Sequence, residues 1–361
     1  MARLEEICSL ITDGSHFSPE DEGVGYPMFS VKDMTPNGFN ISGCKKIGEE
    51  AYKKLVANGC KPLNDDVVVA KDGSYLKTAF VIKGNPEIAL LSSIAILRPK
   101  IDLVVPEYLS YFLKSDAVYR TVSLNYITGT ALKRIILKGI RKIEVDLPDI
   151  GEQEQRAQRL SKVDYLCQLR KQQLDKLDEL VKARFVEMFG NKDYPRMKWN
   201  NVFNTTTGKL DSNAAVDNGK YPFFTCSKEP LKIDSYAFDQ TALLLAGNNA
   251  AGKYDVKYYQ GKFNAYQRTY VLSLKHNWSY KLFQYQLEDK LLYLQTKSLG
   301  GLTKYLTLKI LGELDFIVPP LALQNEFAAF VEHVDEQKQT VQQSLEKLEL
   351  MKKALIQEYF G

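Results

Sequence analysis

The sequence predicts an α+β protein in which two similar globular domains alternate with two long helices that pair as an antiparallel coiled coil. Three observations lead to this prediction: a heptad pattern in the middle of the chain, a second copy of that pattern, and β-type runs in the segment before each copy. The expected order is a globular domain at 1–146, a helix at 147–190, a globular domain at 191–317 and a helix at 318–361. The chain is therefore expected to be a pseudo-two-fold internal repeat.

The first long helix is marked by its ends and by its apolar spacing. Pro148 stands where a missing N–H does no harm, and Gly190 follows the last apolar turn as a stop. Roughly 40 residues at about 1.5 Å each make a rod of about 60 Å, which a globular domain of ordinary size does not bury alone. A similar partner helix is therefore expected. The a and d positions of the heptad hold Leu160, Val163, Cys167, Leu174, Leu177, Val181 and Met188, interrupted by Arg170 and Arg184.

The partner helix is predicted in the same chain. A shift of 171 residues aligns Pro148 with Pro319 and Gln153 with Gln324 without a gap. Coiled-coil helices resemble one another by composition alone, but this match continues upstream, where GTALKRIILK precedes the first helix and GGLTKYLTLK precedes the second. We therefore infer an internal repeat.

The second helix is expected to run antiparallel to the first, because the repeat makes each helix leave its own globular domain in the same way. Its seam consists of Val331, Val334, Val341, Leu345, Leu348 and Leu355, interrupted by Lys338 and Lys352. Antiparallel packing would place Leu160 near Leu348 or Leu355, and Leu174 near Val334 or Val341.

Composition limits the class of protein. At 361 residues, with 45% hydrophobic and 25% charged residues, the chain is expected to be globular with more than one domain. No apolar run reaches the roughly 18 residues of a membrane span, and the N-terminus has no signal-peptide core. Five cysteines without a CxxC pair suit a reducing compartment, and three scattered histidines predict neither a metal site nor a catalytic triad. We expect a cytoplasmic protein that binds no metal.

The two globular segments repeat one plan loosely. GYPMFS at 25–30 is echoed by GKYPFFT at 219–225, and DVVVAKDG at 66–73 by ALLLAGNN at 242–249. Apolar positions match while the loops differ, which indicates two related sites that read different things. The net charge is only +4, but lysines alternate with tyrosines in the second segment. That mixture suits nucleic acid, and it also suits an ordinary solvated surface over a tyrosine-rich core.

The motifs that could indicate catalysis are weak. Residues 247–253, GNNAAGK, fit the phosphate loop GxxxxGK, but Tyr254 replaces the serine or threonine that binds Mg²⁺. A strand-like run follows where a helix is needed, so we interpret the motif as a polar loop between strands. Ser15 and His16 are adjacent in sequence and do not predict a nucleophile–base pair.

Several local motifs together resemble one known family. DGSHFSP at 13–19 and FSVKDM at 29–34 lie near the start, and GTALKRI precedes a Leu-Pro-x-x-x-x-Gln helix opening, LPDIGEQ at 147–153. The second copy of that opening is VPPLALQ at 318–324, which lacks the Glu before Gln324. In these motifs and in its order of domains, the whole chain resembles the DNA-specificity subunit of a type I restriction–modification system. The recognition loops differ between family members, so the resemblance leaves the target sequence undetermined.

The resemblance implies a subunit without catalytic activity. Its two target recognition domains would each read half of a bipartite target in double-stranded DNA. It would recruit two modification subunits, which methylate adenine with S-adenosylmethionine, and two restriction subunits that use ATP and Mg²⁺. Two alternatives remain: an enzyme in its own right, either an NTPase or a methyltransferase, and a coiled-coil connector without sequence-specific DNA binding.

The predicted DNA contacts lie in loops, where glycine allows close approach and polar side chains reach phosphates and base edges. Equivalent loops before the two helices contribute Gly129, Thr130 and Lys133 in the first repeat, and Gly300, Gly301 and Lys304 in the second. Base reading in the second domain is assigned to Lys228, Asn248, Asn249, Lys253 and Arg268, and in the first domain to His16, Lys32, Lys71 and Lys77. For Lys133 and Lys304, a turn with solvated lysines is the alternative.

Overall fold

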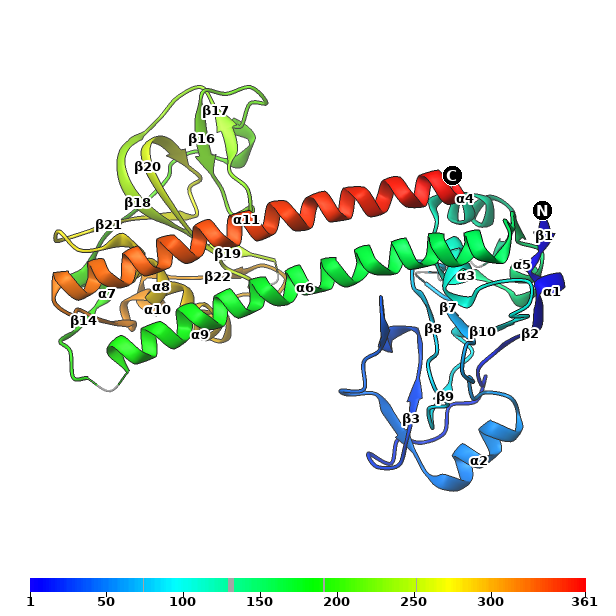
Figure 1. Cartoon of the computed structure of the whole chain (residues 1–361). Helices are drawn as coiled ribbons and strands as arrows, with labels where there is room; N and C mark the ends of the chain where they lie inside the picture. Colours follow the sequence, from blue (N-terminus) through cyan, green and yellow to red (C-terminus); the bar gives the residue numbers. More distant parts are fainter. Residues whose placement is uncertain (74, 129–132, 191, 251) are drawn as a thin grey trace. The chain divides into compact units, whose positions relative to one another are not determined.

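The structure, a computed structural model, describes all residues except 74, 129–132, 191 and 251 (Figure 1). It divides into two compact units: unit 1 is Met1–Gln172 with Gln342–Gly361, and unit 2 is Gln173–Val341. Two long helices, α6 (Ile150–Phe189) and α11 (Leu321–Phe360), each contribute one part to unit 1 and the other to unit 2. The predicted α+β class and both long helices are confirmed. No helix in the described part of the chain is long and apolar enough to span a membrane.

The main sheet of unit 1 is antiparallel, with the strand order β2-β10-β7-β8. In β7 the alternating residues Val67 and Val69 belong to one buried cluster, and Val68 belongs to another. Both faces of the sheet are therefore covered, which explains why the sequence reads as a continuous apolar run rather than an alternation. The strands are β2 (Cys8–Asp13), β7 (Val67–Ala70), β8 (Ala79–Val81) and β10 (Ile94–Pro99), and α3 (Pro106–Leu113) packs on β7 and β8.

Smaller elements complete unit 1. A three-stranded sheet has the order β6-β3-β9, in which β3 and β9 are parallel. These strands are β3 (Tyr26–Phe29), β6 (Lys45–Ile47) and β9 (Ala89–Leu90); short strand pairs are β1 (Ala2–Arg3) with β13 (Glu144–Val145), β4 (Met34–Thr35) with β5 (Gly38–Phe39), and β11 (Ile127–Thr128) with β12 (Arg134–Ile135). The remaining helices are α1 (Leu4–Ile7), η1 (Val31–Asp33), α2 (Glu49–Ala57), α4 (Asp116–Asn125) and α5 (Leu137–Arg141).

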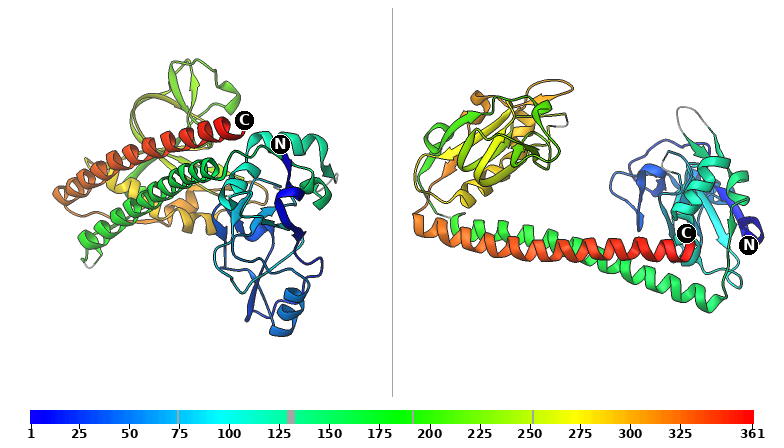
Figure 2. Two further views of the ribbon diagram at one scale, coloured as in Figure 1. Left: turned by 45° about the vertical axis from the view of Figure 1, so that its right-hand side comes forward. Right: turned by 90° about the horizontal axis from the view of Figure 1, so that it is seen from above.

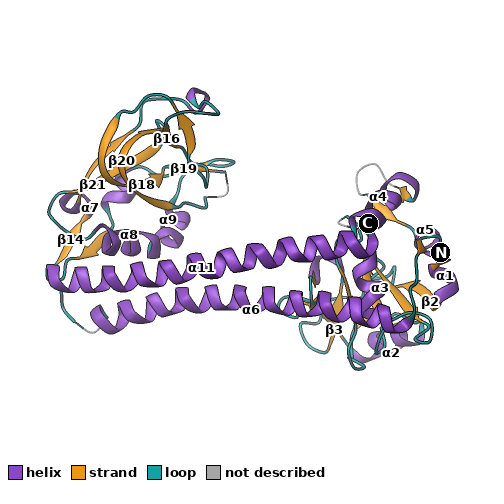
Figure 3. Ribbon diagram, turned by 45° about the horizontal axis from the view of Figure 1, so that its top comes forward, coloured by secondary structure: helices purple, strands orange, loops and turns teal. Residues whose placement is uncertain are grey.

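Unit 2 is built around a six-stranded sheet with the order β15-β21-β18-β20-β16-β17 (Figure 3). The side chains of β18, inside this sheet, also point alternately into two buried clusters, with Leu243 and Leu245 on one face and Leu244 on the other. The strands are β15 (Phe203–Thr207), β16 (Tyr221–Phe224), β17 (Leu231–Ile233), β18 (Phe238–Ala246), β20 (Val256–Ala265) and β21 (Thr269–Leu274). The other elements are β14 (Arg196–Lys198), α7 (Trp199–Val202), η2 (Ser212–Ala214), β19 (Asn248–Asn249), α8 (Tyr280–Asp289), α9 (Leu291–Lys297), β22 (Lys304–Tyr305), α10 (Leu308–Gly312) and β23 (Asp315–Ile317).

The internal repeat extends through both globular parts. Each unit pairs a short strand in parallel with a later one, β3 with β9 in unit 1 and β16 with β20 in unit 2. A glycine packs on the end of each pair: a Cβ on Gly14 would lie 2.1 Å from Leu90 O, and one on Gly208 would lie 1.7 Å from Ala265 O. Only glycine fits so close an approach, so both copies retain it.

A buried glutamine attaches each long helix to its own globular part. Gln153 is 1% exposed; its Oε1 accepts the N–H of Val105 at the start of α3 (3.0 Å), and its Nε2 donates to Pro148 O (2.9 Å). Gln324 is equally buried and accepts the N–H of Ser279 at the start of α8 (3.0 Å), while its Nε2 donates to a proline carbonyl just before α11 (2.8 Å). The proline and glutamine of LPDIGEQ and VPPLALQ therefore hold the long helix in place in the same way in both repeats.

Within unit 1, the two long helices run antiparallel. Asp164 on α6 pairs with Lys352 on α11 (2.5 Å), and further along α6 the Arg170 Nε donates to Ser344 Oγ (3.1 Å). The partner number falls as the α6 number rises, so the predicted direction is confirmed. Lys352 and Arg170 interrupt the apolar seam, and both find polar partners across it.

Unit 2 shows the same direction. Asp178 pairs with Lys338 (2.5 Å) and Arg184 pairs with Glu326 (2.7 Å), so the other two basic interruptions of the seam are also matched across it. Figure 2 shows α6 and α11 side by side in further views. The apolar neighbours predicted for Leu174 agree, since Leu174 packs against the buried cluster that contains Val334 and Val341.

We predict that Gln153→Leu destabilises the protein more than Gln158→Leu, an exposed position on the same helix. The first change removes the hydrogen-bond partner of two half-buried groups, the N–H of Val105 and the carbonyl of Pro148, which costs about 1–3 kcal/mol of unfolding free energy. Chemical denaturation followed by circular dichroism measures both variants. Equal losses would show that the glutamine is not the attachment.

Candidate nucleic-acid interface

In unit 2, the polar loop after β18 is held between two other segments. The N–H of Gly247 donates to Arg268 O (2.8 Å), and the N–H of Leu306 donates to Gly247 O (2.8 Å). The following strand β19 pairs antiparallel with β22, with Asn248 opposite Tyr305 and Asn249 opposite Lys304. Four of the predicted residues, Asn248, Asn249, Arg268 and Lys304, are therefore brought together from three distant parts of the sequence.

The remaining predicted residues of unit 2 lie around this loop. The N–H of Lys253 donates to Asn249 Oδ1 (3.3 Å), and Lys253 is exposed. Cys226 places its Sγ 2.8 Å from Asn248 Oδ1, which brings the segment carrying the exposed Lys228 to the same side. Gly300 has φ +99°, where a Cβ would also lie 2.2 Å from a backbone oxygen, so the turn before Lys304 requires glycine.

The GNNAAGK motif, of which Ala251 lies outside the described residues, lies between strands, as the sequence indicated. It joins β18 to β20 through the short strand β19, and β20 follows where a nucleotide-binding loop would continue as a helix. The Ser15 hydroxyl donates to Phe17 O (2.6 Å), which places Ser15 in a local turn of its own. Among the described residues, no cluster of His, Cys, Asp and Glu could hold a metal ion.

Unit 1 repeats the main-chain hydrogen bonds that hold this loop, and we call this arrangement the loop frame. The N–H of Ile135 donates to Lys71 O (3.0 Å), as that of Leu306 does to Gly247 O (2.8 Å) in unit 2. The N–H of Gly73 donates to Lys133 O (2.9 Å). Lys133 therefore takes the position in unit 1 that Lys304 takes in unit 2. Gly129 and Thr130, which were predicted beside it, lie outside the described residues, and Gly301 of unit 2 is exposed.

The other predicted residues of unit 1 differ in their exposure. Lys71 is only 8% exposed and its ammonium pairs with Asp13, so the geometry does not support a DNA contact by this side chain. The cause is a tertiary ion pair between strands distant in sequence. His16 is exposed, with Nε2 3.7 Å from Asp13 Oδ1; Lys32 is exposed on η1, and Lys77 is exposed with Nζ 5.8 Å from the centre of a tyrosine ring.

Sequence reasoning missed two residues in these loops. They are Asp72 and Arg134, which form an antiparallel β-bridge in unit 1. The equivalent positions in unit 2 are Asn248 and Tyr305, which pair between β19 and β22. The Arg134 side chain is 51% exposed, with Nε 3.9 Å from Asp72 Oδ1. The aligned segments GTALKRIILK and GGLTKYLTLK already place Arg134 opposite Tyr305, and this was the signal that could have found it. The two frames therefore match while their side chains differ.

Comparison with known proteins agrees with the repeat. A family model described as "Type I restriction modification DNA specificity domain" matches residues 1–179 and again 191–350. The specificity subunit of the type I restriction enzyme EcoDI from Escherichia coli is 51% identical over 80 residues, which cover 22% of this chain and 17% of that protein. A putative type I specificity subunit, MjaX, from Methanocaldococcus jannaschii is 22% identical over 194 residues, 52% of this chain and 44% of that protein. These alignments span less than half of the length of either relative.

Solved structures show the same fold. The S subunit of a type I restriction–modification system from M. genitalium superposes with a TM-score of 0.62 at 16% identity, covering 100% of this chain and 95% of that chain. A chain from a structural study of complex assembly and conformational transition of the type I R-M system gives a TM-score of 0.51 at 16% identity, covering 99% and 96%. At this identity the likeness concerns the fold alone.

We predict that replacing Lys133 and Lys304 by alanine weakens DNA binding to every sequence to a similar extent. The slope of log affinity against log salt is negative, and each lost phosphate contact makes it less steep by about 0.9. Fluorescence anisotropy over a salt series measures this slope for each single variant, with Lys162→Ala, at an exposed lysine on α6, as the charge-matched control. If affinity is unchanged at every salt concentration, the two lysines are solvated turn residues.

Proposed function

The chain belongs to the family of type I restriction–modification DNA specificity subunits, and we propose that it reads a bipartite target in double-stranded DNA on behalf of such a system. Each globular part would recognise one half of the target. The chain itself would carry no catalytic centre, and it would work in the cytoplasm.

One observation carries this proposal: the two units present the same loop frame with different side chains. The frame is formed by the loop after β7 or β18 and the short strand β12 or β22. A lysine at the same place in each frame, Lys133 or Lys304, suits the phosphate backbone, which is the same for every sequence. The side chains that differ, such as Arg134 against Tyr305, suit base edges, which vary.

The chemistry of unit 2 fits base reading. Asparagine can hold adenine and arginine can hold guanine through paired hydrogen bonds, each worth about 1–3 kcal/mol of discrimination. Asn248, Asn249 and Arg268 lie together in the frame, and Lys228 and Lys253 are exposed beside them. In unit 1, Arg134 joins His16, Lys32 and Lys77 as a candidate.

The long helices supply surfaces for the partners. Their inner seam is filled, yet Tyr165 is 60% exposed on α6 and Leu350 is 68% exposed on α11 in unit 1. In unit 2, Val186 is 60% exposed on α6. These side chains lie outside the seam between the helices, so they are available for contact with a protein partner. We assign these surfaces to two modification subunits, which would bring S-adenosylmethionine, while two restriction subunits would bring ATP and Mg²⁺.

Two other functions make different predictions. A coiled-coil connector would bind DNA without sequence preference, if it bound DNA at all. An NTPase or methyltransferase would bind nucleotide or S-adenosylmethionine tightly as an isolated chain. The matched frames with divergent side chains favour sequence reading over both.

We predict that exchanging residues 191–317 for the corresponding segment of another family member changes only one half of the methylated target. The expected result follows because unit 1 keeps its own loop frame. The measurement is a map of methylated adenines made with the assembled modification complex, and the parent chain is the control. A change in both halves would rule out one site per unit.

A further inference from the structure

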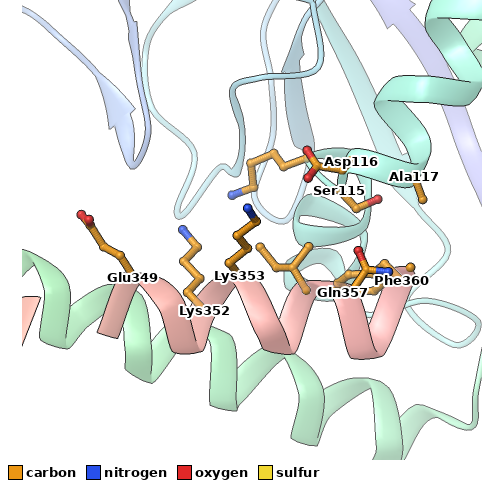
Figure 4. A pocket seen from close by; sticks show the side chains of 11 residues that line it. Ser115, Asp116, Ala117, Glu349, Lys352, Lys353, Gln357 and Phe360 are labelled. Atoms are coloured by element: carbon orange, nitrogen blue, oxygen red, sulfur yellow. The ribbon is translucent and has the colours of Figure 1, made fainter. Parts of the chain in front are cut away.

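A small cavity in unit 1 is lined by lysines that the DNA-reading function does not use. It lies between the turn that joins α3 to α4 and the last turns of α11, and its volume is ≈ 240 Å³. Figure 4 shows Lys352 and Lys353 extending from α11 toward the segment with Ser115 and Asp116. Cavities that hold drug-sized ligands have about 300–1,000 Å³, so this one suits an ion or a very small molecule.

The lysines of the cavity outnumber the carboxylates available to them. Lys352 pairs with Asp164 (2.5 Å), and Glu349 on the rim is taken up by Lys171 (3.1 Å). Lys114 also lines the cavity, with its Nζ 4.6 Å from the centre of a tyrosine ring.

Three charged side chains of the lining form no ion pair with a described residue: the lysines Lys114 and Lys353, and the aspartate Asp116. In the described part of the chain, no carboxylate lies within ion-pair distance of Lys114 or Lys353. Among the described residues that line the cavity, Asp116 has the one side-chain carboxylate that forms no ion pair.

The start of α4 adds positive potential to the same space. Ser115 caps this ten-residue helix, its Oγ accepting the N–H of Val118 (3.4 Å), and Asp116 and Ala117 line the cavity. The N–H groups of the first helical turn have no partner within the helix and carry partial positive charge. An anion in the cavity would face both these groups and the ammonium groups.

The lowered pKa of Lys114 is consistent with the lack of a neighbouring anion. Burial, and next the charge of Lys352, lower the pKa of the Lys114 ammonium to about 8, while Asp164 acts in the opposite direction. The ionisable groups around it are Tyr111 on α3, Asp116 on α4, Asp164 on α6, and Glu349, Lys352 and Lys353 on α11. A nearby anion favours the charged form of a lysine and raises its pKa.

We propose that this cavity binds a small anion, a phosphate or a short carboxylate, between the ammonium groups of Lys114 and Lys353. The proposal is independent of DNA reading and concerns a ligand site of unit 1.

The corresponding region of unit 2 lacks this chemistry. The repeat places Val181 at the position of Lys352 and Lys182 at that of Lys353. The cavity there, of ≈ 420 Å³, is also lined by Glu288 and Asp289. Its other lysines, Lys281 and Lys338, pair with Asp335 (2.6 Å) and Asp178 (2.5 Å). The excess of lysine is therefore a property of unit 1 and not of the shared scaffold.

Isothermal titration of the full chain with inorganic phosphate, sulfate and succinate tests the proposal. We expect binding by the parent chain, and about tenfold weaker binding after Lys114→Gln or Lys353→Gln, since each change removes one charged contact. Lys182→Gln is the matched control and should leave binding unchanged. Circular dichroism checks folding, and Lys353 is exposed, so its variant tests the site even if Lys114→Gln unfolds.

The pH dependence gives a second readout. Since the anion raises the Lys114 pKa from about 8, binding near pH 8 takes up protons, and affinity falls as pH rises above that value. Titrations in buffers with different ionisation enthalpies measure the proton uptake.

Absence of binding by all three anions, or equal affinity of the Lys114→Gln and Lys182→Gln variants, would overturn the proposal. If Lys114→Gln instead weakens DNA binding and its salt dependence, the cavity holds a DNA phosphate and the small-anion site is rejected.

Discussion

The attachment of each long helix to its own globular part is the interaction on which both units depend. A buried glutamine, Gln153 or Gln324, satisfies a main-chain N–H of the globular part and a carbonyl just before the long helix. Because a buried amide without its partners is costly, the glutamine fixes where the helix begins and how it leaves. A second attachment uses an aspartate that the repeat relates, with a different donor in each unit: the Tyr111 hydroxyl donates to Asp164 (2.9 Å), and the Lys281 ammonium donates to Asp335 (2.6 Å).

In each unit, the residues that hold the fold together are different from the loop residues proposed to contact DNA. The positions that hold each unit together are nearly the same in both, as with Gly14 and Gly208 or the apolar strands β7 and β18. The loops after those strands are fixed by main-chain hydrogen bonds, and the side chains of the two loops differ. The proposed reading of two half-targets needs this division, because the scaffold can stay the same while the loops contact different bases.

The sequence predicted the elements whose signals are local or repeated. Both long helices, their direction and the matching of Lys133 with Lys304 follow from heptad spacing and from an ungapped internal alignment. What it could not predict depends on contacts between distant segments. Lys71 looks like a loop cation after a strand, but it is buried against Asp13, which belongs to another strand. The basic cavity of unit 1 depends in the same way on α11 returning beside α4.

The central claim is that two related units read the two halves of one target. Single-molecule sequencing for methylated adenine tests it most directly, in DNA from cells that carry this chain with its modification subunit and from cells that lack the chain. The account predicts one methylated motif that depends on the chain and has two specific halves separated by a fixed number of unspecified positions. A contiguous motif without such a gap would contradict it, as would methylation that is the same in both kinds of cell.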